Sequence, residues 1–229
     1  MIELRQSQVT LGSFRLNVSA QVAGGTRVAL LGASGSGKST LLSLIAGFLT
    51  PDAGEVWLAG QDATAMPPAR RPVSILFQDG NLFPHLTVSD NVALGLRPDL
   101  RLSEAQRQTV TDVLDDIGLG PMADRRPRDL SGGQQSRVAV ARILLRDRPI
   151  ALLDEPFAAL DPGLRAEVLG LVDAKARARG LTIIMASHDL RDAERLCDRL
   201  WLMEAGQIVL DVPMAGLRTD PPPALAAWL

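Results

Sequence analysis

A glycine-rich stretch from Gly32 to Thr40 constrains the fold of this chain more than any other feature, because it matches the pattern G-x-x-x-x-G-K-[ST]. Since glycine lacks a Cβ, successive backbone N–H groups of such a loop can turn inward around a polyanion. Lys38 can then reach the terminal phosphates, and the Ser39 hydroxyl can ligate Mg²⁺. The stretch predicts a loop that binds a nucleoside triphosphate through Gly32, Ala33, Ser34, Gly35, Ser36, Gly37, Lys38, Ser39 and Thr40.

The segments on either side of the loop have the patterns that such a motif requires. Residues 27–31 form a short, largely apolar run that is typical of a buried strand. After the loop, Leu41, Leu44, Ile45 and Phe48 recur at helical spacing, so the phosphates would face the N-terminus of a helix. This context argues against the alternative of a simple glycine- and serine-rich turn.

Strand and helix patterns alternate along most of the chain. Residues 2–22 predict antiparallel strands around a turn at 11–13. Further strands are expected at 54–58, 73–77, 150–153 and 181–185, with a helix at 162–180 and a hairpin at 201–210. Such alternation favours an α/β fold with a mostly parallel central sheet, whose strand ends carry the ligand site.

The span from about residue 79 to 148 differs from the rest because it contains no strand pattern. Ser103 is a candidate N-cap for one helix, and a second helix is expected over 134–145. We therefore expect one domain over residues 1–229, with a core at about 1–78 and 149–229 and an inserted helical subdomain at about 79–148.

Four polar residues directly follow apolar strands, namely Gln78, Asp154, Glu155 and His188. This shared position is a physical reason to assign them to one site. Phosphoryl transfer needs charge neutralisation, a metal and an oriented nucleophile. Asp154 can hold Mg²⁺ directly or through water, and Glu155 can accept a proton from the attacking water. The competing interpretations are a solvated turn for the two carboxylates and a packing role for His188.

Composition narrows the classes of partner. A formal net charge of −2 gives no overall electrostatic reason to bind nucleic acid. The N-terminus lacks the layout of a secretory signal, and no run of about 18 apolar residues occurs, so a membrane role would have to come through a partner. The single cysteine, Cys197, fits a reducing compartment, and we expect it to be a semi-buried helix residue rather than a catalytic thiol.

The pentapeptide 130–134, Leu-Ser-Gly-Gly-Gln, precedes the Asp154 strand by one helix. Together with the phosphate loop, it resembles the ATP-binding subunits of ABC transporters, and the resemblance covers essentially the whole chain. It implies a P-loop NTPase (RecA-like) core with an N-terminal antiparallel β subdomain and an inserted α-helical subdomain. It also implies roles for Gln78 as the Q-loop, which contributes to the metal site, for Asp161 in the D-loop, and for His188 as the switch histidine.

The same resemblance implies a dimer and a membrane partner. Two copies would sandwich two ATP molecules, each between the phosphate loop of one copy and Ser131, Gly132, Gly133 and Gln134 of the other. A separate permease and, indirectly, a periplasmic solute-binding protein would complete an importer on the cytoplasmic face of the inner membrane. We expect the segment around 81–88 to be helical and to receive the permease, with Leu82 and Phe83 either exposed there or part of the core.

Finer resemblance concerns the transported solute. Segments at 44–51, 66–74, 77–78 and 81–88 resemble the ATPases of thiamine importers, but importers of polyamines, iron, sulfate and maltose share parts of them. Uptake of thiamine or its phosphates is the favoured interpretation, and another solute or a non-transport ABC ATPase stays open. A regulatory GTPase or small kinase is disfavoured because the chain has no Asn-Lys-x-Asp motif. The family usually stacks adenine on an aromatic residue where this chain has Leu11; Phe14 lies nearby in sequence.

Overall fold

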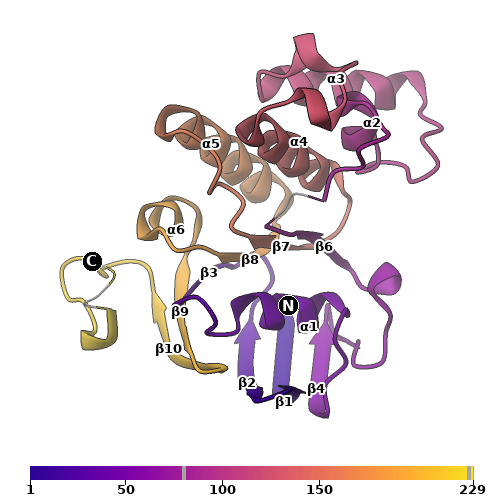
Figure 1. Ribbon diagram of the computed structural model, residues 1–229. Coiled ribbons are helices and arrows are strands. Elements are labelled where there is room, and N and C mark those ends of the chain that lie inside the picture. Colours follow the sequence, from indigo (N-terminus) through magenta and orange to yellow (C-terminus); the bar gives the residue numbers. More distant parts are fainter. Residues whose placement is uncertain (79–80, 226–227, 229) are drawn as a thin grey trace. The chain divides into compact units, whose positions relative to one another are not determined.

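The structure is a computed structural model that describes residues 1–78, 81–225 and 228 (Figure 1). It contains two compact units. The first comprises Met1–Ile75, Pro149–Glu155 and Ala176–Leu229, and the second comprises Leu76–Arg148 and Pro156–Lys175. Residues 156–175, which the sequence interpretation assigns to the core, thus belong to the second unit, and the expected boundary at residue 79 lies outside the described residues.

An antiparallel sheet begins the first unit. It consists of β1 (Ile2–Leu11), β2 (Phe14–Val22), β4 (Ala53–Leu58) and β5 (Gln61–Asp62), in the order β2-β1-β4-β5. Alternate residues of β2, such as Leu16 and Val18, are buried, as expected for a sheet with one face on the core. The predicted antiparallel N-terminal strands are confirmed.

The second sheet carries the parallel strands. Its order is β10 (Gln207–Pro213), β9 (Arg199–Glu204), β3 (Arg27–Leu31), β8 (Thr182–Ala186), β7 (Ile150–Asp154) and β6 (Val73–Leu76). β3 pairs in parallel with β8 and β9, β7 pairs in parallel with β8, and β10 returns antiparallel to β9. Every residue of β3, β7 and β8 is buried, which explains why these strands are largely apolar in sequence.

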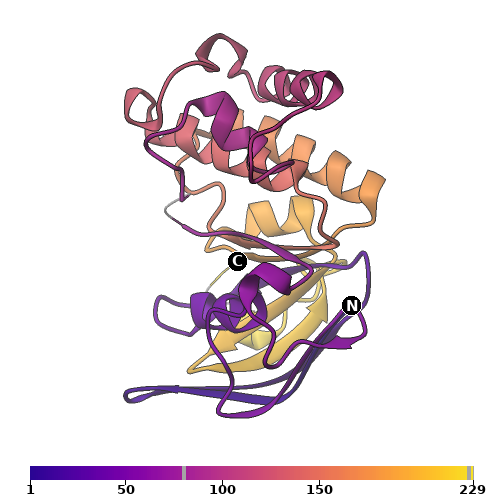
Figure 2. The same ribbon diagram turned by 90° about the vertical axis from the view of Figure 1, so that its right-hand side faces the viewer.

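Helix α1 (Lys38–Ala46) lies between the two sheets of the first unit, as Figures 1 and 2 show. Leu41, Leu44 and Ile45 are fully buried, but Phe48 is 54% exposed. The expectation that Phe48 belongs to the apolar face of this helix is therefore wrong, because the helix ends at Ala46 and Gly47 turns the chain away in the left-handed conformation.

A buried arginine closes the C-terminal end of α1. The Arg71 guanidinium is 1% exposed and donates hydrogen bonds to the carbonyl oxygens of Leu44, Ile45, Thr64 and Met66. Burial lowers the pKa of Arg71 from its ordinary value. A cation at this position complements the negative end of the helix dipole and satisfies carbonyl groups that have no partner within the helix.

Helices dominate the second unit. It contains α2 (Val88–Ala93), α3 (Glu104–Asp116), α4 (Gly132–Leu145) and most of α5 (Pro162–Arg179). Ser103 caps α3 in a capping box with Gln106, as the sequence indicates. The expected helix over 81–88 is not observed, because α2 begins only at Val88 with Thr87 as its N-cap, and the preceding described residues form turns.

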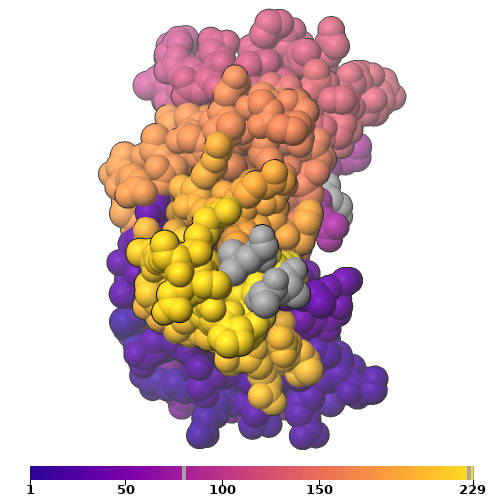
Figure 3. Space-filling model, turned by 90° about the vertical axis from the view of Figure 1, so that its left-hand side faces the viewer, coloured from indigo at the N-terminus to yellow at the C-terminus, as the bar shows by residue number. Residues whose placement is uncertain are grey.

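The short α6 (Leu190–Leu196) and the C-terminal segment complete the first unit. Arg218 donates two hydrogen bonds to the carboxylate of Glu194 on α6, at 2.6 and 2.8 Å. Figure 3 shows the yellow C-terminal segment at the surface beside the amber residues of α6. Short 3₁₀ helices occur at Pro68–Arg70, Gly120–Met122, Pro127–Asp129 and Pro223–Leu225. Within the described part of the chain, no helix has the length and apolarity that crossing a membrane requires.

Candidate functional site

The phosphate loop connects β3 to α1, which is the strand–loop–helix context that the motif requires. Gly37 is the N-cap of α1 and has φ 106°, a left-handed value that side-chain-bearing residues rarely adopt. The loop is also closed on itself, since the Ser36 N–H donates to the Ala33 carbonyl at 3.1 Å. Among the residues that the structure describes, no side chain caps the N-terminus of α1, which is therefore the natural location for an anion.

Lys38 is the first residue of α1, and its side chain folds back over the loop. The Nζ group donates to the carbonyl oxygens of Gly32 at 2.6 Å and Ala33 at 3.0 Å. These bonds hold the ammonium group at the mouth of the loop, within the reach of a phosphate on the helix N-terminus. Ser39 is exposed in the same first turn.

The carboxyl ends of three parallel strands meet beside this loop. Asp154 ends β7 and pairs with Ala186 of β8, which pairs in turn with Leu30 of β3. The Ser187 N–H donates to the Leu30 carbonyl at 3.2 Å and continues this row. Asp154 therefore lies at the carboxyl ends of the parallel strands, where the phosphate loop begins. Its side chain is buried there, with 5% of the residue exposed.

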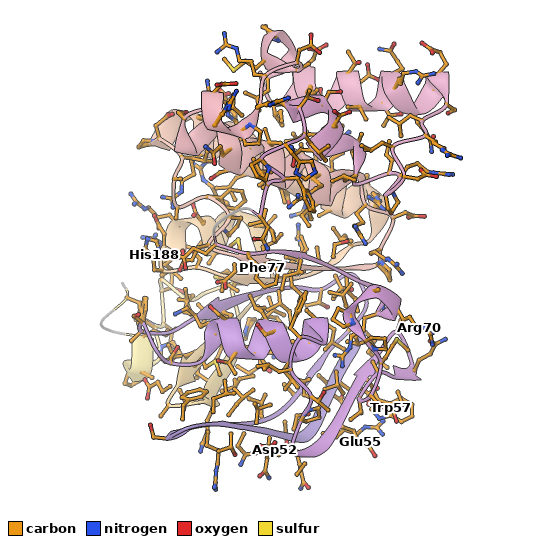
Figure 4. All side chains as sticks on the ribbon, turned by 45° about the vertical axis from the view of Figure 1, so that its right-hand side comes forward. Asp52, Glu55, Trp57, Arg70, Phe77 and His188 are labelled. Atoms are coloured by element: carbon orange, nitrogen blue, oxygen red, sulfur yellow. The ribbon has the colours of Figure 1, made fainter. Side chains whose placement is uncertain are left out.

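Glu155 and His188 are brought together directly. The Oε2 atom of Glu155 lies 2.7 Å from the Nδ1 atom of His188, which is hydrogen-bond distance. The Glu155 side chain is 14% exposed and that of His188 is 62% exposed, so the carboxylate is sheltered and the imidazole faces solvent. Figure 4 shows His188 just beyond the end of β8. The sequence assigns each residue to this site but contains no signal for their mutual bond.

The backbone at Glu155 is unusual. Its φ of 50° is in the left-handed region, where residues other than glycine, asparagine and aspartate are uncommon. The Glu155 N–H donates to the Ala186 carbonyl at 3.0 Å, and this bond fixes the turn after β7. The turn directs the carboxylate toward His188, and such a conformation at a buried strand end is typical of functional sites.

The remaining candidate residues belong to the second unit. Ser131 is the N-cap of α4, and its Oγ accepts a hydrogen bond from the Gln134 N–H at 3.3 Å. The Gln134 side chain accepts in return from the Ser131 N–H at 2.8 Å. A Cβ on Gly132 would meet nothing within 4 Å, so the first turn of α4 is open on that side. The helix thus begins two residues earlier than the expected residue 134.

Gln78 and Asp161 also lie in the second unit. Gln78 is exposed and follows β6 after one residue. Asp161 accepts a hydrogen bond from the Leu164 N–H at 3.1 Å and thereby caps the start of α5. Cys197 is buried and lies immediately after α6, so the expectation of a semi-buried residue within a helix is wrong. Burial raises the pKa of its thiol, as expected of a structural rather than a reactive cysteine.

Sequence reasoning named Phe14 only as an aromatic residue near Leu11, and it did not connect Phe14 or Met203 with the phosphate loop. The ring of Phe14, from β2, lies 2.6 Å from the point that a Cβ on Gly37 would occupy, and the Met203 methyl lies 3.1 Å from it. Leu11, at the end of β1, is 46% exposed and pairs across the hairpin with Phe14. The apolar alternation of β2 was the available signal for Phe14, whereas Met203 comes from a strand far along the chain and has no local signature.

Several known proteins are similar to this chain in sequence. A family model described as "ABC transporter" matches residues 16–158. The thiamine import ATP-binding protein ThiQ of Jannaschia sp. (strain CCS1) is 58% identical over all 229 residues and the whole of both chains. The protein of the same name from Ruegeria sp. (strain TM1040) is 48% identical over 100% of this chain and 99% of its own.

A solved structure with the same fold is the dimeric post-hydrolysis state of the ATP-binding cassette MJ0796 bound to ADP and Pi. It matches with a TM-score of 0.85 and 30% identity, and the match covers 94% of this chain and 100% of that one. Together with the phosphate loop and the carboxylates at the strand ends, these matches confirm the predicted P-loop NTPase fold. The chain belongs to the ABC transporter family, as one of its ATP-hydrolysing domains.

Proposed function

We propose that this chain is the ATPase subunit of an ABC importer that energises the uptake of thiamine or its phosphates through a separate permease. The observation that carries the proposal is the 58% identity, over the full length of both chains, with a protein named as a thiamine import ATP-binding protein. The substrate of an importer does not touch its ATPase subunit, so this similarity rather than the geometry of the site supports the choice of thiamine.

The site residues support an in-line hydrolysis of ATP. The phosphate loop and Lys38 would bind the β- and γ-phosphates, and Glu155 would accept the proton of the attacking water. A bond would form between the water oxygen and the γ-phosphorus while the bond to the β–γ bridging oxygen breaks. His188, at 2.7 Å from Glu155, would orient the carboxylate and contact the γ-phosphate.

We further propose a Mg²⁺ site formed by Ser39, Asp154 and Gln78. Hydroxyl, carboxylate and amide oxygens are the hard donors that Mg²⁺ prefers, and Asp154 is held 5% exposed at the sheet edge beside the loop. When bound, Mg²⁺ would neutralise charge on the phosphate oxygens. The role of this chain would be to hold the oxygen donors in place, with Gln78 connecting the metal to the segment that follows β6.

A second copy of the chain would complete each site. The open first turn of α4, with Ser131, Gly132, Gly133 and Gln134 at its start, is a second helix N-terminus that can receive an anion. Asp161 would lie in the same dimer contact. The relative MJ0796 has been solved as a dimer with ADP and Pi, which supports this arrangement.

We also propose a functional division of the chain into a core at about 1–78 and 149–229 and a helical subdomain at about 79–148.

The permease would bind the segment 81–88 in the second unit. Leu82 packs against the apolar cluster of this unit, whereas Phe83 is 45% exposed. The Arg142 guanidinium lies 5.8 Å from the Phe83 ring centroid, and the His85 ring meets it edge-on at 6.1 Å. Phe83 is thus an exposed aromatic side chain that Arg142 and His85 flank, and such a side chain is suited to contact with a protein partner. Such a partner would place the chain peripherally at the cytoplasmic face of the inner membrane.

Uptake of radiolabelled thiamine by whole cells tests the proposal. Cells that lack this chain should lose saturable thiamine uptake, a plasmid copy should restore it, and a Glu155→Gln copy should not. Thiamine uptake that is unchanged in the deleted cells would refute the choice of solute. Parallel loss of polyamine, iron, sulfate or maltose uptake would then identify the alternative importer.

A further inference from the structure

The phosphate loop is contacted from behind by two segments that are distant from it in sequence. One is the start of β2 at Phe14, and the other is the end of β9 at Met203 with the two-residue turn, Ala205 and Gly206, that leads to β10. All of these residues belong to the first unit. We term Phe14, Met203 and Gly206 the loop support.

Backbone hydrogen bonds connect the turn to both neighbours. The Gly206 N–H donates to the carbonyl of Ser36 in the phosphate loop at 2.9 Å. The Gly206 carbonyl accepts from the Asn17 N–H of β2, also at 2.9 Å. One residue of the turn therefore ties the phosphate loop to the antiparallel sheet.

No side chain fits at position 206. Gly206 has φ 79° and follows Ala205 at φ 43°, as in a two-residue hairpin turn in which both central residues have positive φ. A Cβ on Gly206 would collide with the carbonyl oxygen of Arg15. The close approach of the turn to β2 thus requires glycine, and it brings the Gly206 N–H within reach of Ser36.

Side chains and carbonyl groups fill the remaining space behind the loop. The Met203 carbonyl oxygen occupies the space that a Cβ on Gly32 would need, so it packs directly against the first glycine of the loop. The Phe14 ring and the Met203 methyl lie 2.6 and 3.1 Å from the Cβ point of Gly37 and close the last glycine. Met203 is fully buried and Phe14 packs against the same apolar cluster, so neither can readily move away.

We propose that the loop support holds the phosphate loop in its anion-binding conformation, and that Phe14 and Met203 are positioning residues for the nucleotide. This inference rests on the proposed role of Gly32–Thr40 in binding ATP. A glycine-rich loop without such support would sample many conformations, and binding would have to select the one in which its N–H groups converge. Filling the space behind Gly32 and Gly37 reduces that cost before the nucleotide arrives.

Two substitutions loosen the support without adding charge. Phe14→Leu removes the ring atoms nearest to Gly37, and Met203→Leu removes the terminal methyl with almost no change of volume. Val18→Ala is the matched control, because Val18 lies on the same strand as Phe14 and is 1% exposed in the same apolar cluster. Unlike Phe14 and Met203, Val18 is not among the nearest neighbours of Gly32 or Gly37.

Titration calorimetry with ADP and Mg²⁺ measures the effect on each folded variant, with thermal unfolding as the measure of stability. We expect the dissociation constant to rise about tenfold in Phe14→Leu and Met203→Leu, comparable with the loss of one well-placed donor to a charged phosphate. In steady-state hydrolysis, KM for ATP should rise by a similar factor while kcat at saturating ATP stays within about twofold. Val18→Ala should lower the unfolding temperature and leave the dissociation constant for ADP and KM for ATP unchanged.

Two outcomes separate the inference from the proposed function. If the unsubstituted protein binds no ADP, the assignment of the phosphate loop itself is wrong. If it binds ADP and all three variants change the dissociation constant equally, or none does, the loop support has only a structural role and the inference is wrong.

Discussion

Replacement of Glu155 by glutamine tests the general-base role that we propose for this carboxylate. Glutamine is isosteric with glutamate, and its amide oxygen can accept the same hydrogen bond from His188 Nδ1 that now spans 2.7 Å. The turn after β7 is held by the Glu155 N–H bond to Ala186, which the substitution does not touch. ATP binding should therefore persist. General-base catalysis contributes about 10²- to 10⁴-fold, so kcat should fall by that factor, or about 3 to 5 kcal/mol in the barrier.

Phosphate release at saturating ATP, measured alongside equilibrium ATP binding on the same sample, gives both quantities. Glu55→Gln is the matched control, because Glu55 undergoes the same change of one atom on β4, where it contacts Arg5 and Trp57. Figure 4 shows Glu55 and Trp57 well away from His188. A Glu155→Gln protein whose kcat stays within tenfold of the unsubstituted value would refute the base assignment.

Three further substitutions test other parts of the structure. Ser131→Arg should abolish the ATP-dependent dimer that we propose, as measured by light scattering, because it places a bulky side chain at the open end of α4. Arg71→Met should lower the free energy of unfolding by about 3 kcal/mol, or the unfolding temperature by about 6 to 12 °C. The reason is that buried carbonyl groups at the end of α1 lose the hydrogen-bond donor that Arg71 supplies. Leu11→Tyr should tighten ATP binding by about tenfold if Leu11 lies under the base, because stacking on an aromatic ring stabilises a base by about 1 to 3 kcal/mol.

Each of these variants has a control within the chain. Ser103→Arg changes an N-cap serine in an equivalent capping box on α3, so a dimer lost in both proteins would attribute the effect to the helix cap. Arg97→Met removes an exposed arginine and should leave stability nearly unchanged, and equal losses at both arginines would contradict the role of burial. Val209→Tyr adds an aromatic ring at a position on β10 that is 48% exposed, and a similar gain in affinity there would exclude a specific stack.

Much of the fold could be predicted because its buried strands have a strong local pattern. Residues 28–31 and 150–153 are continuous apolar runs, and both lie in fully buried parallel strands. Phe48 was placed wrongly because helical spacing continues past the point where Gly47 ends α1. The range of α6 could not be predicted, because its seven residues, four of them charged, are too few to show an apolar period, and Cys197, expected within a helix, lies just after its end.

The candidate site was predictable to the level of which residues gather at the strand ends, and no further. Asp154, Glu155 and His188 follow apolar strands, and parallel pairing explains why Asp154 and the phosphate loop share an edge. The bond between Glu155 and His188 could not be read from the sequence, because it depends on the backbone turn that the two loops impose. The contacts of Met203 with the phosphate loop likewise depend on strand order, which places β9 beside β3.

The left-handed backbone at Glu155 means that the site is maintained at a cost in stability. An L-residue in this conformation costs about 1 kcal/mol, and a second carboxylate directly after Asp154 adds like-charge repulsion. Asparagine adopts this conformation more readily and carries no charge. Glu155→Asn should therefore resist urea better than the natural protein, by about 1 kcal/mol, while losing hydrolysis. With the general-base role that we propose for Glu155, this glutamate would exchange part of the stability of the fold for turnover.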